Sequence, residues 1–154
     1  MSSEPARRES PSFGVDSMVL IYHFENHERF GPDASRLLRA AEEDRCRLVV
    51  SVLGRLEVLV SPKRHGREDL CRRYREVFDG FPNMSVVPVD AALVELASDL
   101  RAAHNLRTPD AIHLATALHR GAAAFVTEDH RHFPAQIDGL SVLSIAGALD
   151  RIGE

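Results

Sequence analysis

Short apolar runs alternate along this chain with longer segments in which apolar residues recur every three or four positions. The short runs predict strands over residues 13–15, 47–51, 84–89, 122–127 and 140–145. The longer segments predict helices over residues 18–24, 34–41, 52–60, 67–78, 91–103, 109–120 and 146–152. Strands that alternate with helices indicate an α/β fold, a three-layer sandwich in which helices cover both faces of a mostly parallel sheet of about four to five strands.

Polar residues and prolines mark where several of these helices begin. Ser17, Asp33 and Asp90 are expected to cap the helices that follow them. Thr108 is expected to cap the helix over 109–120, because Pro109 suits the first helical position, where an N–H group has no partner. Turn signals end other elements: residues 61–66 predict a turn, and a proline at position 88 predicts an edge strand or the end of a strand.

Length and composition predict a single domain over residues 13–154, preceded by a flexible, polar N-terminal tail over residues 1–12. No apolar run approaches the about 18 residues that a membrane span requires, so we expect no membrane association. Cys46 and Cys71 form no metal or disulfide motif, which favours reduced thiols and a cytoplasmic protein. The only lysine is Lys63, which excludes a P-loop and a phospho-acceptor receiver domain.

Acidic residues are predicted to meet at one edge of the sheet. Asp16 and Asp129 follow predicted strands, Asp110 lies in the first turn of a predicted helix, and Glu57 lies about one turn into another. In open α/β sheets, sites form outside the carboxyl ends of the strands. Without a cation, these carboxylates would repel one another and some of their pKa values would rise. The cluster therefore suggests an oxygen-rich site for Mg²⁺ or Mn²⁺.

Four short motifs resemble those of PIN domains, and most closely those of VapC-like toxin ribonucleases of type II toxin–antitoxin systems. The motifs are Val15-Asp16-Ser17, residues 51–57 with Glu57, Thr108-Pro109-Asp110 with the following helix, and Phe125-Val126-Thr127-Glu128-Asp129. Many relatives have asparagine where this chain has Glu128. The resemblance implies a PIN-like fold and a Mg²⁺-dependent endoribonuclease that leaves 5′-phosphate and 3′-hydroxyl ends, with Mn²⁺ as a possible substitute.

The resemblance also implies a role for each site residue. Asp16, Glu57, Asp110 and Asp129 would be the catalytic, metal-binding acids, and Ser17 and Thr127 would support them. The implied partners are an RNA substrate, a cognate antitoxin protein and a second copy of the chain in a homodimer. Arg107, which precedes the acid-bearing helix, and His130, which follows Asp129, are candidates for contacts with the RNA phosphates.

Other readings stay open. A PIN-like scaffold without turnover could bind RNA or a protein, although the four acids argue against it. A metal-dependent phosphatase would need a second acid where the chain has Met18. His113 lies one turn after Asp110, where packing or surface exposure is commoner than catalysis. A basic set around residues 63–75 is either a solvated face or a phosphate-binding surface in a chain with a net charge of −4.

Overall fold

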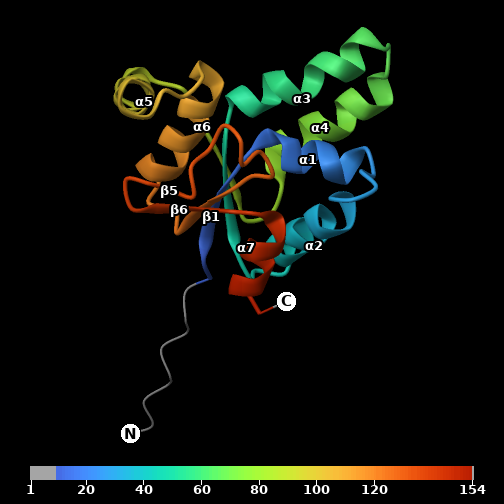
Figure 1. The fold of residues 1–154 in the computed structure, drawn as a ribbon. Helices are drawn as coiled ribbons and strands as arrows, with labels where there is room; N and C mark the ends of the chain where they lie inside the picture. The colour runs from blue at the N-terminus through green and yellow to red at the C-terminus, as the bar shows by residue number, and fades with distance from the viewer. Residues whose placement is uncertain (1–9, 154) are drawn as a thin grey trace, which may run out of the picture.

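The structure, a computed structural model, describes residues 10–153, in which seven helices flank a six-stranded sheet (Figure 1). The strands are β1 (Ser12–Val15), β2 (Arg47–Ser51), β3 (Met84–Val87), β4 (Ala124–Val126), β5 (Gln136–Ile137) and β6 (Leu140–Leu143). The helices are α1 (Ser17–Phe24), α2 (Gly31–Glu42), α3 (Leu53–Arg64), α4 (Glu68–Gly80), α5 (Ala91–His104), α6 (Thr108–His119) and α7 (Ile145–Arg151).

The sheet has the strand order β3-β2-β1-β4-β6-β5. All neighbouring strands are parallel except β5 and β6, which form an antiparallel pair at one edge. The position of β3 at the other edge confirms the prediction from Pro88. The prediction of about four to five strands omitted β5, because two residues are too few to show a period. The parallel strands end at the same edge of the sheet, and this carboxyl edge positions the acids.

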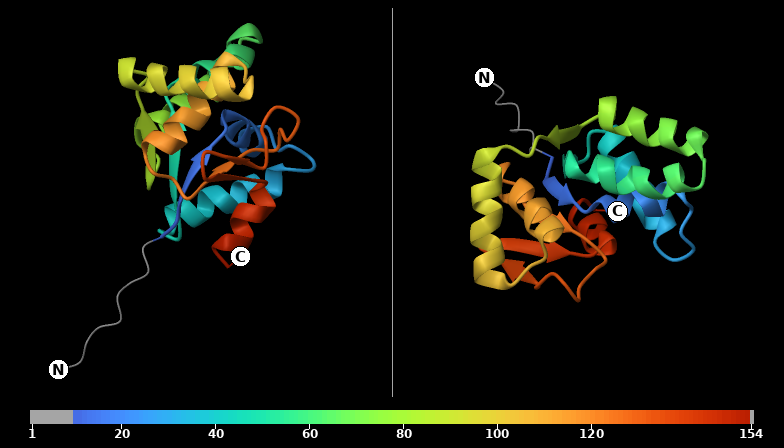
Figure 2. Two further views of the ribbon diagram at one scale, coloured as in Figure 1. Left: turned by 60° about the vertical axis from the view of Figure 1, so that its left-hand side comes forward. Right: turned by 90° about the horizontal axis from the view of Figure 1, so that it is seen from above.

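Two hydrophobic cores lie on opposite faces of the sheet (Figure 2). Leu48 and Val50 of β2 point into the core that α1, α2, α3, α4 and α7 cover, whereas Val49 points into the core that α5 and α6 cover. Successive residues of a strand point to opposite faces, so a buried strand is apolar on both sides. The predicted three-layer α/β sandwich is thereby confirmed.

Helix α6 lies very close to β1. A Cβ atom built on Gly14 would lie 2.4 Å from the Cβ atom of Ala117, so only glycine fits at this position of β1 without a shift. Phe125 of β4 would be 3.2 Å away. The close contact sets the distance between the helix that carries Asp110 and the strand that ends before Asp16.

Three helices have an N-cap other than the predicted residue. Asp16, not Ser17, is the N-cap of α1, and its Oδ1 accepts a hydrogen bond from the backbone N–H of Met18. Helix α2 begins at Gly31, so Asp33 lies within its first turn. Helix α6 begins at Thr108 after Arg107, without a side-chain cap. The Asp90 cap of α5 is confirmed by a bond from the backbone N–H of Leu93.

Two other boundaries also differ. Helix α3 continues through Pro62 to Arg64, where a turn over residues 61–66 was predicted, and Pro62 is buried. The predicted tail over residues 1–12 falls largely outside the described residues, and Ser12 already belongs to β1. The two cysteines are free and buried, as expected.

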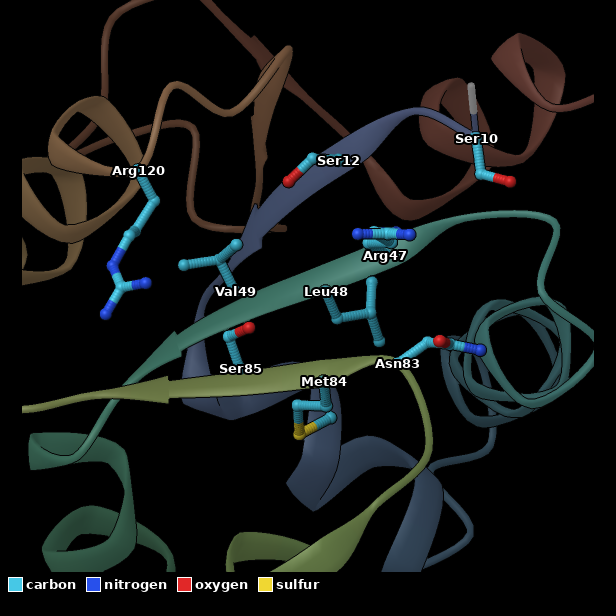
Figure 3. A pocket seen from close by; sticks show the side chains of 9 residues that line it. All are labelled: Ser10, Ser12, Arg47, Leu48, Val49, Asn83, Met84, Ser85 and Arg120. Atoms are coloured by element: carbon cyan, nitrogen blue, oxygen red, sulfur yellow. The ribbon is translucent and has the colours of Figure 1, made fainter. Parts of the chain in front are cut away.

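The cavity in Figure 3, of about 570 Å³, lies at the amino ends of β1, β2 and β3. Its lining includes Arg47 at the start of β2 and Arg120 after α6. This edge of the sheet is opposite the carboxyl edge. The cavity is therefore separate from the predicted acidic site.

Candidate active site

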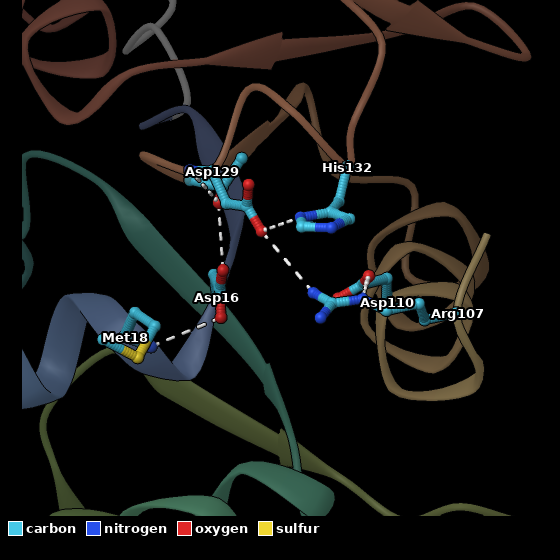
Figure 4. Close-up of polar contacts among 7 residues, drawn as sticks. Asp16, Met18, Arg107, Asp110, Asp129 and His132 are labelled. Atoms are coloured by element: carbon cyan, nitrogen blue, oxygen red, sulfur yellow. Dashed lines mark hydrogen bonds and ion pairs between the residues drawn. The ribbon is translucent and has the colours of Figure 1, made fainter.

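Asp16 lies at the carboxyl end of β1 and is 9% exposed. Its Oδ1 accepts the capping bond of α1, and its Oδ2 accepts a hydrogen bond from the hydroxyl of Thr127 at 2.9 Å. Both oxygens are therefore fixed by neighbours that come from two different segments of the chain (Figure 4). Burial raises the pKa of Asp16 above its usual value of 3.8, although the positive charge of His113 lowers it.

Thr127 joins Asp16 to Asp129. It follows β4 directly, is fully buried, and its Oγ1 accepts a hydrogen bond from the backbone N–H of Asp129 at 3.0 Å while its hydroxyl donates to Asp16. The side chain of Asp129 lies 2.7 Å from Nδ1 of His132. Burial alone would raise the pKa of Asp129, but the bond from His132 holds it below its usual value. Through these two hydrogen bonds, Thr127 can orient both Asp16 and Asp129.

Arg107 lies between the other two aspartates. Its Nε donates to Oδ2 of Asp110 at 2.7 Å, and its Nη2 lies 3.5 Å from Oδ2 of Asp129 (Figure 4). Asp110 is 7% exposed in the first turn of α6, whereas the side chain of Arg107 is 59% exposed. The guanidinium is the cation that Asp110 and Asp129 share in the structure.

Glu57 reaches the site from α3. Its Oε1 accepts a hydrogen bond from the hydroxyl of Ser17 at 3.1 Å and lies 2.5 Å from Nε2 of His113. Burial would raise the pKa of Glu57, but the bonds from His113 and Ser17 lower it overall. The same contact raises the pKa of His113, against the effect of its burial. The predicted supporting role of Ser17 and the position of Glu57 are consistent with this geometry.

The four acids therefore lie in two hydrogen-bonded sets, one with Asp16, Asp110 and Asp129 and one with Glu57, and the charges of Glu57 and His113 act on Asp16. Asp129 and Glu57 have lowered pKa values, because contacts with the side chains of His132 and His113 favour their ionised forms against the effect of burial. Asp16 has a raised pKa, mainly because of its burial, and the negative charge of Glu57 adds to the rise. The sequence did not indicate that Arg107, His113 and His132 contact the acids directly.

Replacement of Asp16 by asparagine is expected to raise the melting temperature in metal-free buffer near neutral pH. Because the pKa of Asp16 is higher in the folded protein than in the unfolded chain, the folded protein becomes less stable as pH rises from 3.8 through that pKa. Asparagine does not ionise, so the variant does not undergo this loss. The gain should therefore shrink towards about pH 4. Melting curves from about pH 4 to 8 in a chelator would measure it, and a difference that does not depend on pH would contradict the expectation.

The donor set suits a hard divalent cation, because carboxylate oxygens are the preferred ligands of Mg²⁺. Within residues 10–153, however, no three acidic, histidine or cysteine side chains are arranged so that they could hold a metal ion. Asp110 and Asp129 turn an oxygen towards Arg107 instead. A metal would fit these residues only after the guanidinium of Arg107 has moved away.

The two predicted phosphate-binding residues line one cavity beside the acids. Arg107 and His130 share a space of about 420 Å³ with Arg131, His132 and other residues of the loop after Asp129. His130 is exposed. The cavity places cationic side chains next to the carboxylates, where a phosphate group could contact them.

Two side chains near the site have roles that the sequence did not indicate. The carboxylate of Glu128 accepts a hydrogen bond from the backbone N–H of Ile145 at 2.8 Å. Glu128 therefore stabilises the first turn of α7. His113, for which packing or exposure was expected, is buried and contacts Glu57. Only its spacing of one turn from Asp110 hinted at this contact.

The basic set around residues 63–75 is largely a solvated helix face. Arg67 pairs with Asp69, and Arg75 pairs with Glu68, all of them exposed or partly exposed. These pairs offset part of the positive charge that a phosphate-binding surface would need. The observation favours the solvated face over the phosphate-binding alternative.

The sequence and the fold were compared with known proteins. No protein of curated function matches the chain by sequence. The structure resembles a toxin–antitoxin complex from Klebsiella pneumoniae, with 25% identity, a TM-score of 0.65, and coverage of 88% of this chain and 98% of that one. It also resembles VapC20 of Mycobacterium tuberculosis, a sarcin–ricin loop cleaving toxin, with 16% identity, a TM-score of 0.65, and coverage of 84% and 98%.

A third similar structure is VapBC2 of Rickettsia felis bound to a promoter DNA fragment, with 12% identity, a TM-score of 0.67, and coverage of 86% and 98%. Among residues 10–153, no helix is both long and apolar enough to cross a membrane. The model of the PIN domain family matches residues 14–138, a span that begins in β1 and includes all four acids. This chain therefore belongs to the PIN domain family.

Proposed function

We propose that this protein is a Mg²⁺-dependent endoribonuclease and the toxin of a toxin–antitoxin pair. The observation that carries the proposal is the network at the carboxyl edge of the sheet, in which Asp16, Glu57, Asp110 and Asp129 come from four segments of a PIN fold. The likeness to toxin–antitoxin proteins supports the biological role. Cytoplasmic RNA would be the substrate.

The four acids would hold Mg²⁺, and Mn²⁺ could replace it. A bound ion of this kind makes a nucleophile from water at neutral pH and offsets the charge that develops on the phosphoryl oxygens. Thr127 would keep Asp16 oriented through its hydroxyl, and Ser17 would do the same for Glu57. Arg107 would release Asp110 and Asp129 and, with His130, contact the phosphates of the RNA.

Hydrolysis with water as the nucleophile accounts for the products. Attack on the phosphorus with departure of the 3′-oxygen leaves a 5′-phosphate on one fragment and a 3′-hydroxyl on the other. No side chain has to form a covalent bond with the RNA. The acids therefore act through charge and orientation.

Replacement of Arg107 by glutamine is expected to strengthen metal binding and to weaken RNA binding. Most of the Arg107 side chain is exposed to water, so its ion pairs should compete only modestly with a cation, and their loss should tighten Mn²⁺ binding about two- to fivefold. Titration calorimetry with Mn²⁺, and RNA binding in a chelator, would measure the two effects. Arg47→Gln, which removes a charge at the opposite edge of the sheet, is the control. Weaker Mn²⁺ binding by the Arg107 variant would contradict the idea that Arg107 competes with the metal ion for Asp110 and Asp129.

Protein partners would be a cognate antitoxin and a second copy of the chain. Helix α3 exposes Leu56 and Val60 on the same side as Val52, the residue before its first turn, and Leu56 is 60% exposed. Exposed apolar side chains that line up on a helix favour contact with another protein. This surface begins on the helix that carries Glu57, so a partner bound there would lie beside the site.

A binding module without turnover is the second candidate. The ion pairs of Arg107 favour it, because they occupy oxygens of Asp110 and Asp129 that catalysis would need. An Arg107 side chain that stays in place in the presence of Mg²⁺ would make the site inert. RNA would then be bound by the basic cavity and released uncut.

The two candidates differ in the fate of the RNA. Purified protein would be incubated with total cellular RNA in Mg²⁺ or in a chelator, and new 5′ ends would be mapped by sequencing. Discrete 5′-phosphate ends that need Mg²⁺ and disappear with the Asp129→Asn variant are expected for the nuclease. RNA that is bound without new ends would contradict the proposed nuclease activity and support the binding module.

A further inference from the structure

His113 is a buried polar side chain in the middle of the acidic network. It lies on α6 one turn after Asp110 and is 4% exposed. Its Nε2 lies 2.5 Å from Oε1 of Glu57, and its Nδ1 has no hydrogen-bond partner among the described residues. A buried nitrogen without a partner costs free energy, so an apolar side chain would suit packing better. The position of His113 is therefore explained by its contact with Glu57 and not by packing.

The two hydrogen bonds of Glu57 reach the same oxygen. Ser17 and His113 both contact Oε1, and Oε2 has no hydrogen bond within the described part of the chain. An ionised carboxylate can only accept hydrogen bonds, so His113 must donate through Nε2–H. The two donors come from α1 and α6 and fix the carboxylate from two sides. Glu57 is consequently held by one oxygen and has the other free.

We propose that His113 is a positioning residue that, together with Ser17, holds Glu57 by Oε1 and leaves Oε2 as its metal-binding atom. The proposal rests on the proposed function, because it concerns the metal that the acids would hold. Metal-binding carboxylates are usually held by hydrogen bonds from neighbouring groups. Loss of such a partner typically lowers metal affinity or activity about 10- to 100-fold.

A structural role and a positioning role predict different results for His113→Leu. Leucine keeps much of the volume and removes the unpaired nitrogen, and the side chain of Glu57 remains 31% exposed to water. For a positioning role we expect about 10-fold weaker Mn²⁺ binding by the folded protein, in addition to any change in melting temperature. For a purely structural role, the melting temperature would fall and the Mn²⁺ affinity of the folded protein would stay the same.

The decisive experiment measures Mn²⁺ affinity by electron paramagnetic resonance of the free ion, with melting curves on the same samples. His113→Gln should bind Mn²⁺ within about threefold of the wild type, because its amide N–H can replace Nε2–H. Thr116→Val is the matched control, since Thr116 is buried one turn further along α6 and its hydroxyl bonds only to the backbone carbonyl of Ile112. This control should leave the affinity unchanged. Excess Mn²⁺ should restore RNA cleavage by the leucine variant.

The outcomes separate this inference from the proposed function. Equal Mn²⁺ affinity of wild type and His113→Leu would overturn the positioning role and leave the nuclease intact. Weaker binding by both the leucine and the glutamine variants would also overturn it, because the donated hydrogen bond would then not be the cause. A wild-type protein that binds no Mn²⁺ would overturn the metal site itself, and this inference with it.

Discussion

The Asp110→Asn variant is expected to cleave RNA at least about 100-fold more slowly than the wild type at saturating Mg²⁺. Loss of a residue that only supports a metal ligand costs about 10- to 100-fold, so loss of a ligand itself should cost more. Asparagine keeps the shape of the side chain and removes its charge. The measurement is the rate of cleavage of one mapped RNA under single-turnover conditions.

Asp33→Asn provides the control for this variant. Asp33 lies in the first turn of α2 and pairs with Arg36 three residues later at 3.3 Å, much as Asp110 in the first turn of α6 pairs with Arg107 three residues earlier. The two substitutions therefore remove similar ion pairs, but only one removes an acid of the site. The control should cleave at the wild-type rate. A rate for Asp110→Asn within about tenfold of the control would show that Asp110 is not a metal ligand.

The Gly14→Ala variant is expected to lose about 2–3 kcal/mol of unfolding free energy, because an added methyl group would overlap Ala117. The new Cβ atom would lie 2.4 Å from the Cβ atom of Ala117, so α6 or β1 has to move. For a protein of this size the loss lowers the melting temperature by about 4–12 °C. Because α6 carries Asp110 and β1 ends before Asp16, the same shift should slow RNA cleavage.

Two further variants test this explanation. Ala117→Gly in the Gly14→Ala background restores the space, so its melting temperature should be higher than that of Gly14→Ala alone. Gly80→Ala adds a methyl group where nothing lies within 4 Å, and it should be neutral or slightly stabilising. A loss from Gly14→Ala that Ala117→Gly fails to reduce would mean that the overlap is not its cause.

The apolar periodicity predicted the layers of the fold because burial on one face or on both faces leaves a repeat in the sequence. Residues 47–51 form β2 as predicted, and both cores follow from the alternation of Leu48, Val49 and Val50. The two-residue strand β5 has too few positions to show a repeat. Helix α3 continues through Pro62, where packing of α3 against α4 outweighed a local turn signal.

The acids could be predicted from the sequence, but their partners could not. Asp16 and Asp129 follow strands, and strand ends have a known place in a parallel sheet. The side chain of Arg107 could have pointed to solvent, and its contact with Asp129, 22 positions away in the chain, depends on how α6 is oriented against the sheet. The contact between His113 and Glu57 joins residues 56 positions apart and leaves no local pattern.

The acids come from both sides of the sheet. Glu57 is carried by α3 in one layer, Asp110 by α6 in the other, and Asp16 and Asp129 follow the central strands β1 and β4. An ion bound by all four would hold the two helical layers together as a cross-link does, and its binding energy would add to the cooperativity of unfolding. Separation of the layers would then release the ion, so the metal site and the folded state would be lost in a single step.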